Sequence, residues 1–205
     1  MEGSFIQSKL SAMKTSRIIL SALFLLAVFQ IKAQEKYEIV DGAGYLVISG
    51  KSNTTGWMLK SKQLKGDAQI LMNGDELQHL SRVIVNIDAS TIVNAENKRM
   101  TKKAQSTLLT DANPLVTFFA YGFSKVNDDP MEMHGNLYMA GKNVDLIFHF
   151  TTRMQEDIVW IVAVADSKFS DFGLEPPTDF GGAVQCKDEL KIEVQLPLVK
   201  ATGIE

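Results

Sequence analysis

Two neighbouring segments of alternating polarity constrain the fold of this chain most strongly. From Met131 to Met139 the odd positions are apolar or glycine and the even ones are mostly polar, and from Val144 to Phe150 the even positions are all apolar. A period of two is typical of β-strands with one buried face. A turn at Gly141-Lys142, with glycine at its first central position, would join the two strands. The sequence therefore predicts an antiparallel hairpin with one apolar face.

This turn also predicts a register. It sets Gly135 opposite Phe148 on the apolar face, and His134 opposite His149 on the outward face. The remaining apolar pairs are Met139 with Val144, Leu137 with Leu146, and Met133 with Phe150. A third strand at 115–123, connected through Asn127-Asp128-Asp129-Pro130, would extend the hairpin into a meander. Such local connections disfavour a parallel sheet.

Further strands are predicted along the chain, and together they indicate an all-β fold. They lie at 45–48, 64–72, 83–87, 158–165 and 192–198, with a loop at 50–56 and a turn at 73–75. About eight strands that follow one another predict an antiparallel, up-and-down barrel. The strand at 158–165 is apolar on both faces, which predicts that a helix or a second subunit covers it.

One short helix is predicted around residues 95–109. Met100, Ala104 and Leu108 lie four apart, and Asn94 is a candidate N-cap. The opposite face is basic, and we interpret it as a solvated surface rather than a phosphate or membrane site. Its residues are Lys98, Arg99, Lys102 and Lys103. The narrow apolar stripe predicts that this helix lies across the barrel as a flap or buttress.

The first 33 residues have the pattern of a secretory signal peptide. Basic residues precede the apolar run 18–29, and Ala33 marks the expected cleavage site. Twelve mostly apolar residues are fewer than the roughly twenty that a membrane-spanning helix needs. The sequence therefore predicts one domain at 34–205, located in the periplasm or secreted.

Charge and cysteine content narrow the function. The formal net charge is −3 for the whole chain, and without 1–33 it is more negative, which argues against a nucleic-acid partner. Cys186 is the only cysteine, so an intramolecular disulfide cannot form. No phosphate loop, nucleophile elbow or metal-binding spacing occurs, and we expect no cofactor, no metal and no catalysis. An enzyme that uses Cys186 or a histidine is the alternative.

The inner face of the predicted barrel carries no charge, which favours an apolar ligand. An eight-stranded barrel is just wide enough to be filled by side chains or to hold one slim ligand. We expect Phe172 and Leu174 to turn inward near one barrel end, with Asp171 capping a local turn. The candidate ligand-binding residues are Trp57, Phe118, Met133, Gly135, Leu137, Met139, Phe148, Phe150, Trp160, Asp171, Phe172 and Leu174. The alternatives are a packed barrel without a ligand and a small outer-membrane barrel.

Several short motifs occur in order along residues 37–199. They are Gly50-Lys51-Ser52-Asn53 with Trp57, Arg99-Met100, Asn113-Pro114-Leu115-Val116-Thr117-Phe118, His134-Gly135-Asn136-Leu137-Tyr138-Met139-Ala140-Gly141 and Ser170-Asp171-Phe172-Gly173-Leu174. This ordered set resembles the YceI-like, polyisoprenoid-binding family of secreted bacterial proteins. The family's His-Leu in the helix is replaced here by Met100-Thr101. The resemblance implies a lipocalin-like barrel that binds a long isoprenoid or similar amphiphile without catalysis and without stable membrane insertion, often as a homodimer.

Overall fold

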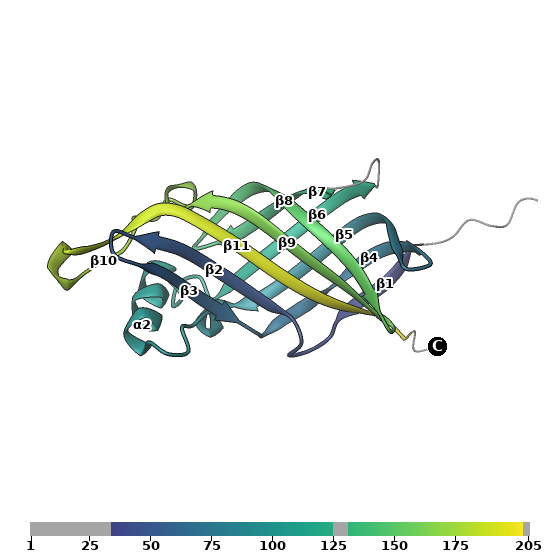
Figure 1. The fold of residues 1–205 in the computed structure, drawn as a ribbon, viewed down its shortest axis with the longest axis horizontal. Coiled ribbons are helices and arrows are strands. Elements are labelled where there is room, and N and C mark those ends of the chain that lie inside the picture. Colours follow the sequence, from purple (N-terminus) through teal and green to yellow (C-terminus); the bar gives the residue numbers. More distant parts are fainter. Residues whose placement is uncertain (1–33, 125–130, 203–205) are drawn as a thin grey trace, which may run out of the picture. The chain divides into compact units, whose positions relative to one another are not determined.

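Long antiparallel strands curl into a barrel in the computed structural model, which describes residues 34–124 and 131–202 (Figure 1). The predicted signal segment 1–33 and the predicted connection Asn127 to Pro130 lie outside the described residues. The strands are β1 (Glu35–Ile39), β2 (Tyr45–Ser52), β3 (Gly56–Ser61), β4 (Leu64–Asn73), β5 (Glu76–Asp88), β6 (Leu115–Ser124), β7 (Met131–Met139), β8 (Lys142–Gln155), β9 (Ile158–Lys168), β10 (Thr178–Asp179) and β11 (Val184–Lys200). The helical elements are η1 (Ala89–Thr91), α2 (Lys98–Thr107), η2 (Ser170–Phe172) and η3 (Phe180–Gly182).

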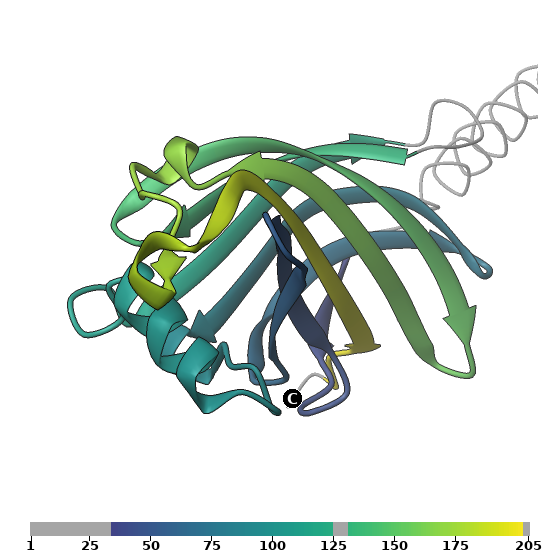
Figure 2. The ribbon, with the colours of Figure 1, turned by 60° about the vertical axis from the view of Figure 1, so that its left-hand side comes forward.

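Eight of the strands close the barrel in the order β1-β4-β5-β6-β7-β8-β9-β11, because β1 pairs with both β4 and β11. The predicted lipocalin-like antiparallel barrel is therefore confirmed. The long strand β11 pairs with β9 along one edge. Along its other edge the C-terminal end pairs with β1 and the preceding part pairs with β2. The β2–β3 hairpin extends from this edge and lies beside α2 at one end of the barrel (Figure 2). We call this end the α2 end.

The β7–β8 hairpin forms as predicted, but its register differs by two residues. Gly135 pairs with Leu146, and Met133 pairs with Phe148. The turn is centred on Ala140-Gly141, where both residues have positive φ, 51° and 80°. This is the condition for a type I′ turn, whose twist suits a two-residue hairpin loop. A shift of two keeps every side chain on its predicted face and changes only its partner.

On the outward face of this hairpin the predicted histidine pair does not form. His134 lies opposite Ile147, whereas His149 lies opposite Glu132. The His149 Nδ1 atom is 3.3 Å from Glu132 Oε1, and both side chains are more than half exposed. Within the described residues, no group of three or more His, Cys, Asp or Glu side chains is arranged to hold a metal ion.

Other boundaries differ from the prediction near the α2 end. The segment 50–56 is only partly a loop, because β2 continues to Ser52 and β3 begins at Gly56. Strand β3 was not predicted, since Trp57, Leu59 and Ser61 alternate with exposed or half-buried residues over only six positions. The helix α2 is capped by Asn97, whose side chain accepts a hydrogen bond from the Met100 N–H. The predicted cap Asn94 instead accepts hydrogen bonds from the N–H groups of Glu96 and Asn97.

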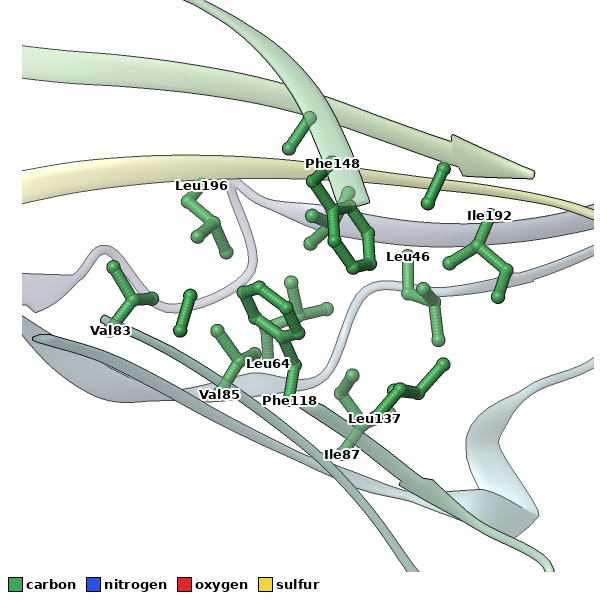
Figure 3. Packing of buried hydrophobic residues seen from close by; sticks show 14 of the residues in the cluster. Leu46, Leu64, Val83, Val85, Ile87, Phe118, Leu137, Phe148, Ile192 and Leu196 are labelled. Carbon is green, nitrogen blue, oxygen red and sulfur yellow. The ribbon is translucent and has the colours of Figure 1, made fainter. Parts of the chain in front are cut away.

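Aromatic side chains fill the middle of the barrel. The Phe118 and Phe148 rings face each other across the interior with centroids 4.7 Å apart (Figure 3). The Phe123 and Phe150 rings meet edge to face at 4.8 Å. Aliphatic residues of β4, β5 and β11 surround them, with Ala68, Ile70 and Leu198 fully buried. This part of the interior is a packed core, which we call the packed half.

The outward face of β9 is apolar but only half-buried. Val159, Ile161 and Ala163 are buried, while Ile158, Trp160, Val162 and Val164 alternate with them on the outside. Trp160 was predicted to line the interior, but it lies on the outer face of β9. There the Arg153 guanidinium lies 5.4 Å from the Trp160 ring centroid. Among the described residues, no helix is both long and apolar enough to span a membrane.

Candidate ligand-binding cavity

A cavity of ≈ 200 Å³ opens at the α2 end of the barrel. A cavity needs about 10–15 Å³ to hold one water molecule. This cavity therefore has room for on the order of a dozen groups the size of a water molecule or a methylene. Three segments form most of its walls: the β2–β3 hairpin, α2, and the segment from Phe169 to the start of β11. Met139 of β7 and Leu190 of β11 complete the lining. Because these walls come from distant parts of the sequence, only the folded chain creates the cavity.

The strand wall of the cavity is apolar. Ile48 of β2 and Leu59 of β3 point inward and are buried, with 4% and 6% exposure. Gly50 lies beside Trp57, and a Cβ atom at this glycine would be 2.5 Å from Trp57 Cζ2. The missing side chain therefore lets the indole lie flat against β2. The Trp57 ring also packs at 5.9 Å from the Phe169 ring.

The helix wall presents the predicted apolar stripe to the cavity. Met100, Ala104 and Leu108 all line it, as expected for residues spaced by four on an α-helix. Two side-chain hydrogen bonds anchor the helical region to the barrel. Asn94 Nδ2 donates to the Met58 carbonyl at 2.9 Å, and Gln105 Nε2 donates to the Ser90 carbonyl at 3.1 Å. The predicted helix therefore acts as a wall over the barrel opening.

The third wall is the segment 177–183. We call this segment, and not the helix α2, the flap. Asp179 forms an ion pair with Arg99 of α2, and the Arg99 guanidinium lies 4.4 Å from the Phe180 ring centroid. Burial alone would raise the pKa of the Asp179 carboxyl. Hydrogen bonds from the Phe180 N–H and Arg99, with the charges of Arg99 and Lys103, outweigh it and lower this pKa. These contacts hold the flap against the helix.

Cys186 lies in the wall between the flap and the barrel. Burial raises the pKa of its thiol, and the nearby Trp57 indole opposes part of this rise. The indole Nε1 and the sulfur do not reach hydrogen-bond geometry, and Nε1 is buried without a partner among the described residues. A thiol with a raised pKa is a weak nucleophile at neutral pH, so Cys186 contributes an apolar surface.

The structure separates the predicted binding residues into groups. Trp57 and Met139 line the cavity. Six others face the interior but belong to the packed half or its border and do not line the cavity, namely Phe118, Met133, Gly135, Leu137, Phe148 and Phe150. The space beside Gly135 is filled, because a Cβ there would be 2.4 Å from Phe118 Cε2. Trp160 lies outside the barrel.

The turn at 170–174 closes the barrel end rather than lining the cavity. Phe172 is 1% exposed, and Leu174 is half-buried against the core, so both turn inward as predicted. The Asp171 carboxylate accepts hydrogen bonds from Ser167 Oγ at 3.0 Å and from the Lys168 N–H at 2.8 Å. Asp171 therefore stabilises the local turn, which was the structural role expected for it.

Most of the cavity lining was not predicted. The helix stripe was recognised as apolar but not as a binding surface, and Cys186 was interpreted as a small buried hydrophobe. The flap residues gave no signal, because they follow a Pro-Pro pair in a segment without periodicity. The residues missed include Ile48, Leu59, Arg99, Lys103, Phe169, Asp179, Phe180 and Leu190.

The closed eight-stranded barrel with a cavity under a helix defines a lipocalin-like fold. A family model described as the YceI-like domain matches residues 29–198. The chain therefore belongs to the YceI-like family, as its motifs indicated. No curated protein matched the chain by sequence.

Solved structures support the same fold. BcnA of Burkholderia cenocepacia is similar with a TM-score of 0.65 and 15% identity, covering 80% of this chain and 99% of that protein. A polyisoprenoid binding domain from Saccharophagus degradans, implicated in plant cell wall breakdown, has a TM-score of 0.58 and 14% identity, with 80% and 98% covered. The Campylobacter jejuni YceI protein has a TM-score of 0.52 and 18% identity, with 75% and 85% covered. At these identities the similarity shows the fold.

Proposed function

We propose that this protein binds a long apolar or amphiphilic ligand, a polyisoprenoid or another lipid, in the cavity at the α2 end. The observation that carries the proposal is the cavity itself, whose strand and helix walls are apolar in the midst of an otherwise packed barrel. The similar domain from Saccharophagus degradans is described as polyisoprenoid binding, and this supports the ligand class.

The size of the cavity sets how much of the ligand it holds. About a dozen carbon atoms buried at about 0.8 kcal/mol each contribute roughly 10 kcal/mol before the costs of association. These costs are about 4–15 kcal/mol. A longer chain gains affinity only if its remainder finds further apolar surface, by leaving through the mouth or by displacing interior side chains.

We propose binding without catalysis. The raised pKa of Cys186 supports this, because the thiolate rather than the thiol is the nucleophile. If any turnover is detected with the bound compound, Cys186→Ala tests the enzymatic alternative. Loss of that turnover in the variant would favour an enzyme, whereas an unchanged complex with the ligand would favour a binding protein.

We propose that the protein acts in the cell envelope. The support is the signal-like pattern of residues 1–33, with basic residues before an apolar run. Fractionation of the native host, with an antibody against the barrel, tests the location. Recovery in the periplasmic fraction without detergent supports the proposal. Recovery only in detergent extracts of the outer membrane would favour the membrane-barrel alternative.

A homodimer is a further proposal, and the apolar outer face of β9 supports it. Trp160 and its neighbours Val162 and Val164 are half-buried on the outside of the isolated chain. Sedimentation analysis of the protein and of Trp160→Asp tests the dimer. A monomer at all concentrations for the unmodified protein would contradict it.

Filling the cavity tests the main proposal. Ala104 lines the cavity and is 8% exposed, so Ala104→Leu places three additional carbon atoms in the space. We expect farnesol binding to weaken at least tenfold in this variant. Ser106→Leu is the matched control, because Ser106 is exposed on the same helix and does not line the cavity. Equal binding by both variants and the unmodified protein would place the ligand elsewhere.

The natural ligand is identified by mass spectrometry of organic extracts. Protein purified from its native host should release an isoprenoid or another lipid, and Ala104→Leu purified in parallel should release less. Extracts of both proteins without any lipid, together with no binding of farnesol, would favour a packed barrel without a ligand.

A further inference from the structure

Four cations of α2 form one exposed face in an acidic protein. They lie in two neighbouring rows, because residues three and four apart on a helix are adjacent. They are Lys98, Arg99, Lys102 and Lys103, and all four are exposed. The helix contains no acidic residue, although the whole chain has a formal net charge of −3. Positive charge is therefore concentrated on this helix, and we call these four residues the basic face.

The three lysines of the basic face form no ion pairs. In the described part of the chain, no carboxylate lies within ion-pair distance of any of them. This includes Glu96 and Asp111, which flank the helix in the sequence. Arg99, in contrast, pairs with Asp179 of the flap. The uncompensated charge of the lysines attracts a negatively charged surface.

An exposed aromatic side chain lies beside the basic face, at the tip of the flap. Phe180 is 67% exposed, and its ring centroid is 4.4 Å from the Arg99 guanidinium. Gly181 and Gly182 follow it, and at both glycines no atom lies within 4 Å of the position that a Cβ would take. The flap projects beyond the barrel at the α2 end (Figure 1, Figure 2). Its tip is therefore open to a partner.

The fold does not require a phenylalanine at this tip. Phe180 has a φ of 50°, a conformation that glycine or asparagine adopts at lower cost, and its exposed ring contributes little to the core. Aromatic rings lie readily at the boundary between water and a bilayer, and a neighbouring basic surface adds attraction to anionic lipids. Charge alone was interpreted as a solvated surface, and the exposed ring beside it changes this interpretation.

We propose that the α2 end docks reversibly on the surface of a bilayer that contains anionic phospholipids. The lysines of the basic face contact the lipid headgroups, and the Phe180 ring enters the interface, without any segment crossing the bilayer. Docking itself does not depend on the proposed function. If the cavity holds a lipid, as that function states, docking places the cavity mouth against the membrane that supplies or receives it.

Co-sedimentation with lipid vesicles tests the inference. The anionic vesicles contain equal amounts of phosphatidylcholine and phosphatidylglycerol, and the reference vesicles contain phosphatidylcholine alone. The protein is purified from its native host, so that its N-terminus is the one that exists in the cell. We expect binding at least about tenfold stronger to the anionic vesicles at low salt, and release as salt is raised, because salt screens exposed charges. Equal binding to both kinds of vesicle would overturn the inference.

Two double variants locate the charged contact. Lys98→Gln with Lys102→Gln removes two cations that do not line the cavity, and glutamine keeps a similar helix propensity. This variant should bind the anionic vesicles at least about tenfold more weakly. The matched control is Lys36→Gln with Lys200→Gln, which removes two exposed lysines of β1 and the C-terminal end of β11. These strand ends lie opposite the α2 end (Figure 1), so the control should bind as the unmodified protein does. Similar losses in both double variants would contradict docking at the α2 end.

Phe180→Ser tests the apolar contact. Because the ring is exposed, its removal should leave the barrel folded, which thermal unfolding checks, and should weaken vesicle binding severalfold. Tyr121→Ser is the matched control, since Tyr121 of β6 is also more than half exposed. If the two variants bind alike, the flap tip does not enter the interface and the inference is wrong. Competition by soluble polyglutamate as strong as that by anionic vesicles would show a general anion site and would also overturn it.

Docking and binding in the cavity fail separately. Ala104→Leu fills the cavity and leaves the basic face and the flap tip intact, so it should keep vesicle binding while farnesol binding weakens. If it loses vesicle binding as the Lys98 and Lys102 double variant does, the vesicles are held by capture of a lipid in the cavity, and the docking inference is wrong. If anionic vesicles bind but farnesol does not, the docking inference stands and the proposed function fails.

Discussion

The packed half of the barrel and its α2 end have the same alternating strands but different contents. In the packed half, rings from β6 and β8, the two strands that flank β7, meet at 4.7 and 4.8 Å and leave no room beside Gly135 of β7. At the α2 end, the interior is bounded by a helix and a flap, and a cavity of ≈ 200 Å³ remains. At the α2 end, the strand residues that face the cavity are Ile48, Leu59 and Leu190. Their side chains are smaller than the paired phenylalanines of the packed half.

This difference shows that inward alternation defines a face but not a binding site. Whether the face is filled depends on side-chain volume and on which strands converge. The two ends should therefore respond oppositely to substitutions, with stability governed by the packed half and ligand affinity by the α2 end.

The largest expected effect is on stability in the packed half. Phe148 is 1% exposed and packs on Phe118, so Phe148→Ala should lower the free energy of unfolding by about 3–5 kcal/mol. Denaturant unfolding measures this change. Farnesol affinity of the folded fraction should stay within about twofold, because Phe148 does not line the cavity. A loss of affinity without a loss of stability would contradict the separation of the two regions.

Adding volume at Gly135 should cost less than removing a ring, but should still destabilise the protein. A Cβ there meets the Phe118 ring at 2.4 Å and the Phe119 carbonyl at 3.3 Å. Gly135→Leu should therefore lower the free energy of unfolding by about 1–3 kcal/mol. Ala104→Leu, which enters the cavity, should change it by less than about 1 kcal/mol. Equal stability changes in these two variants would show that the α2 end is also packed.

Cys186 provides a chemical measure of the cavity wall. Since burial raises the pKa of its thiol, we expect alkylation by iodoacetamide to be several-fold slower at pH 8 than at an exposed cysteine. Bound farnesol should slow it further. The control is a Cys186→Ala, Gln185→Cys double variant, which moves the thiol to an exposed neighbour. Equal rates at both positions, with and without farnesol, would place Cys186 outside the cavity wall.

The smallest expected effect concerns acid. The pKa values of Asp88, Asp179 and Asp188 are lowered, for Asp88 and Asp188 mainly by hydrogen bonds from Ser90 and Ser170. Carboxyls with lowered pKa contribute stability above their unfolded pKa of about 4, and this contribution is lost as pH falls through the folded values. Thermal unfolding between pH 5 and 2 should show this loss, and Asp188→Asn should show less of it. A stability that rises as the pH falls below 4 would contradict the assignment.

The register of the β7–β8 hairpin shows where sequence reasoning reached its limit. The alternation from Met131 to Phe150 correctly predicted which side chains face inward, since a strand has a period of two. It did not predict that Ala140 adopts a positive φ, because this conformation is rare for residues other than glycine. As a result Gly135 was paired with Phe148, although the structure pairs it with Leu146 and fills its space with Phe118.

The sequence by itself determined most of the strands, the single predicted helix, the uncharged inward faces of those strands and the family of this protein, because periodicity and short motifs are local properties of a chain. It did not predict the short strands β1, β3 and β10. Only the tertiary structure decided where the interior is open. Trp57, Lys103 and Phe180 lie far apart in the sequence and meet at one cavity, since β2 and β3, α2 and the flap converge at the same barrel end. The packing of whole elements sets the space between them, and no local pattern encodes it.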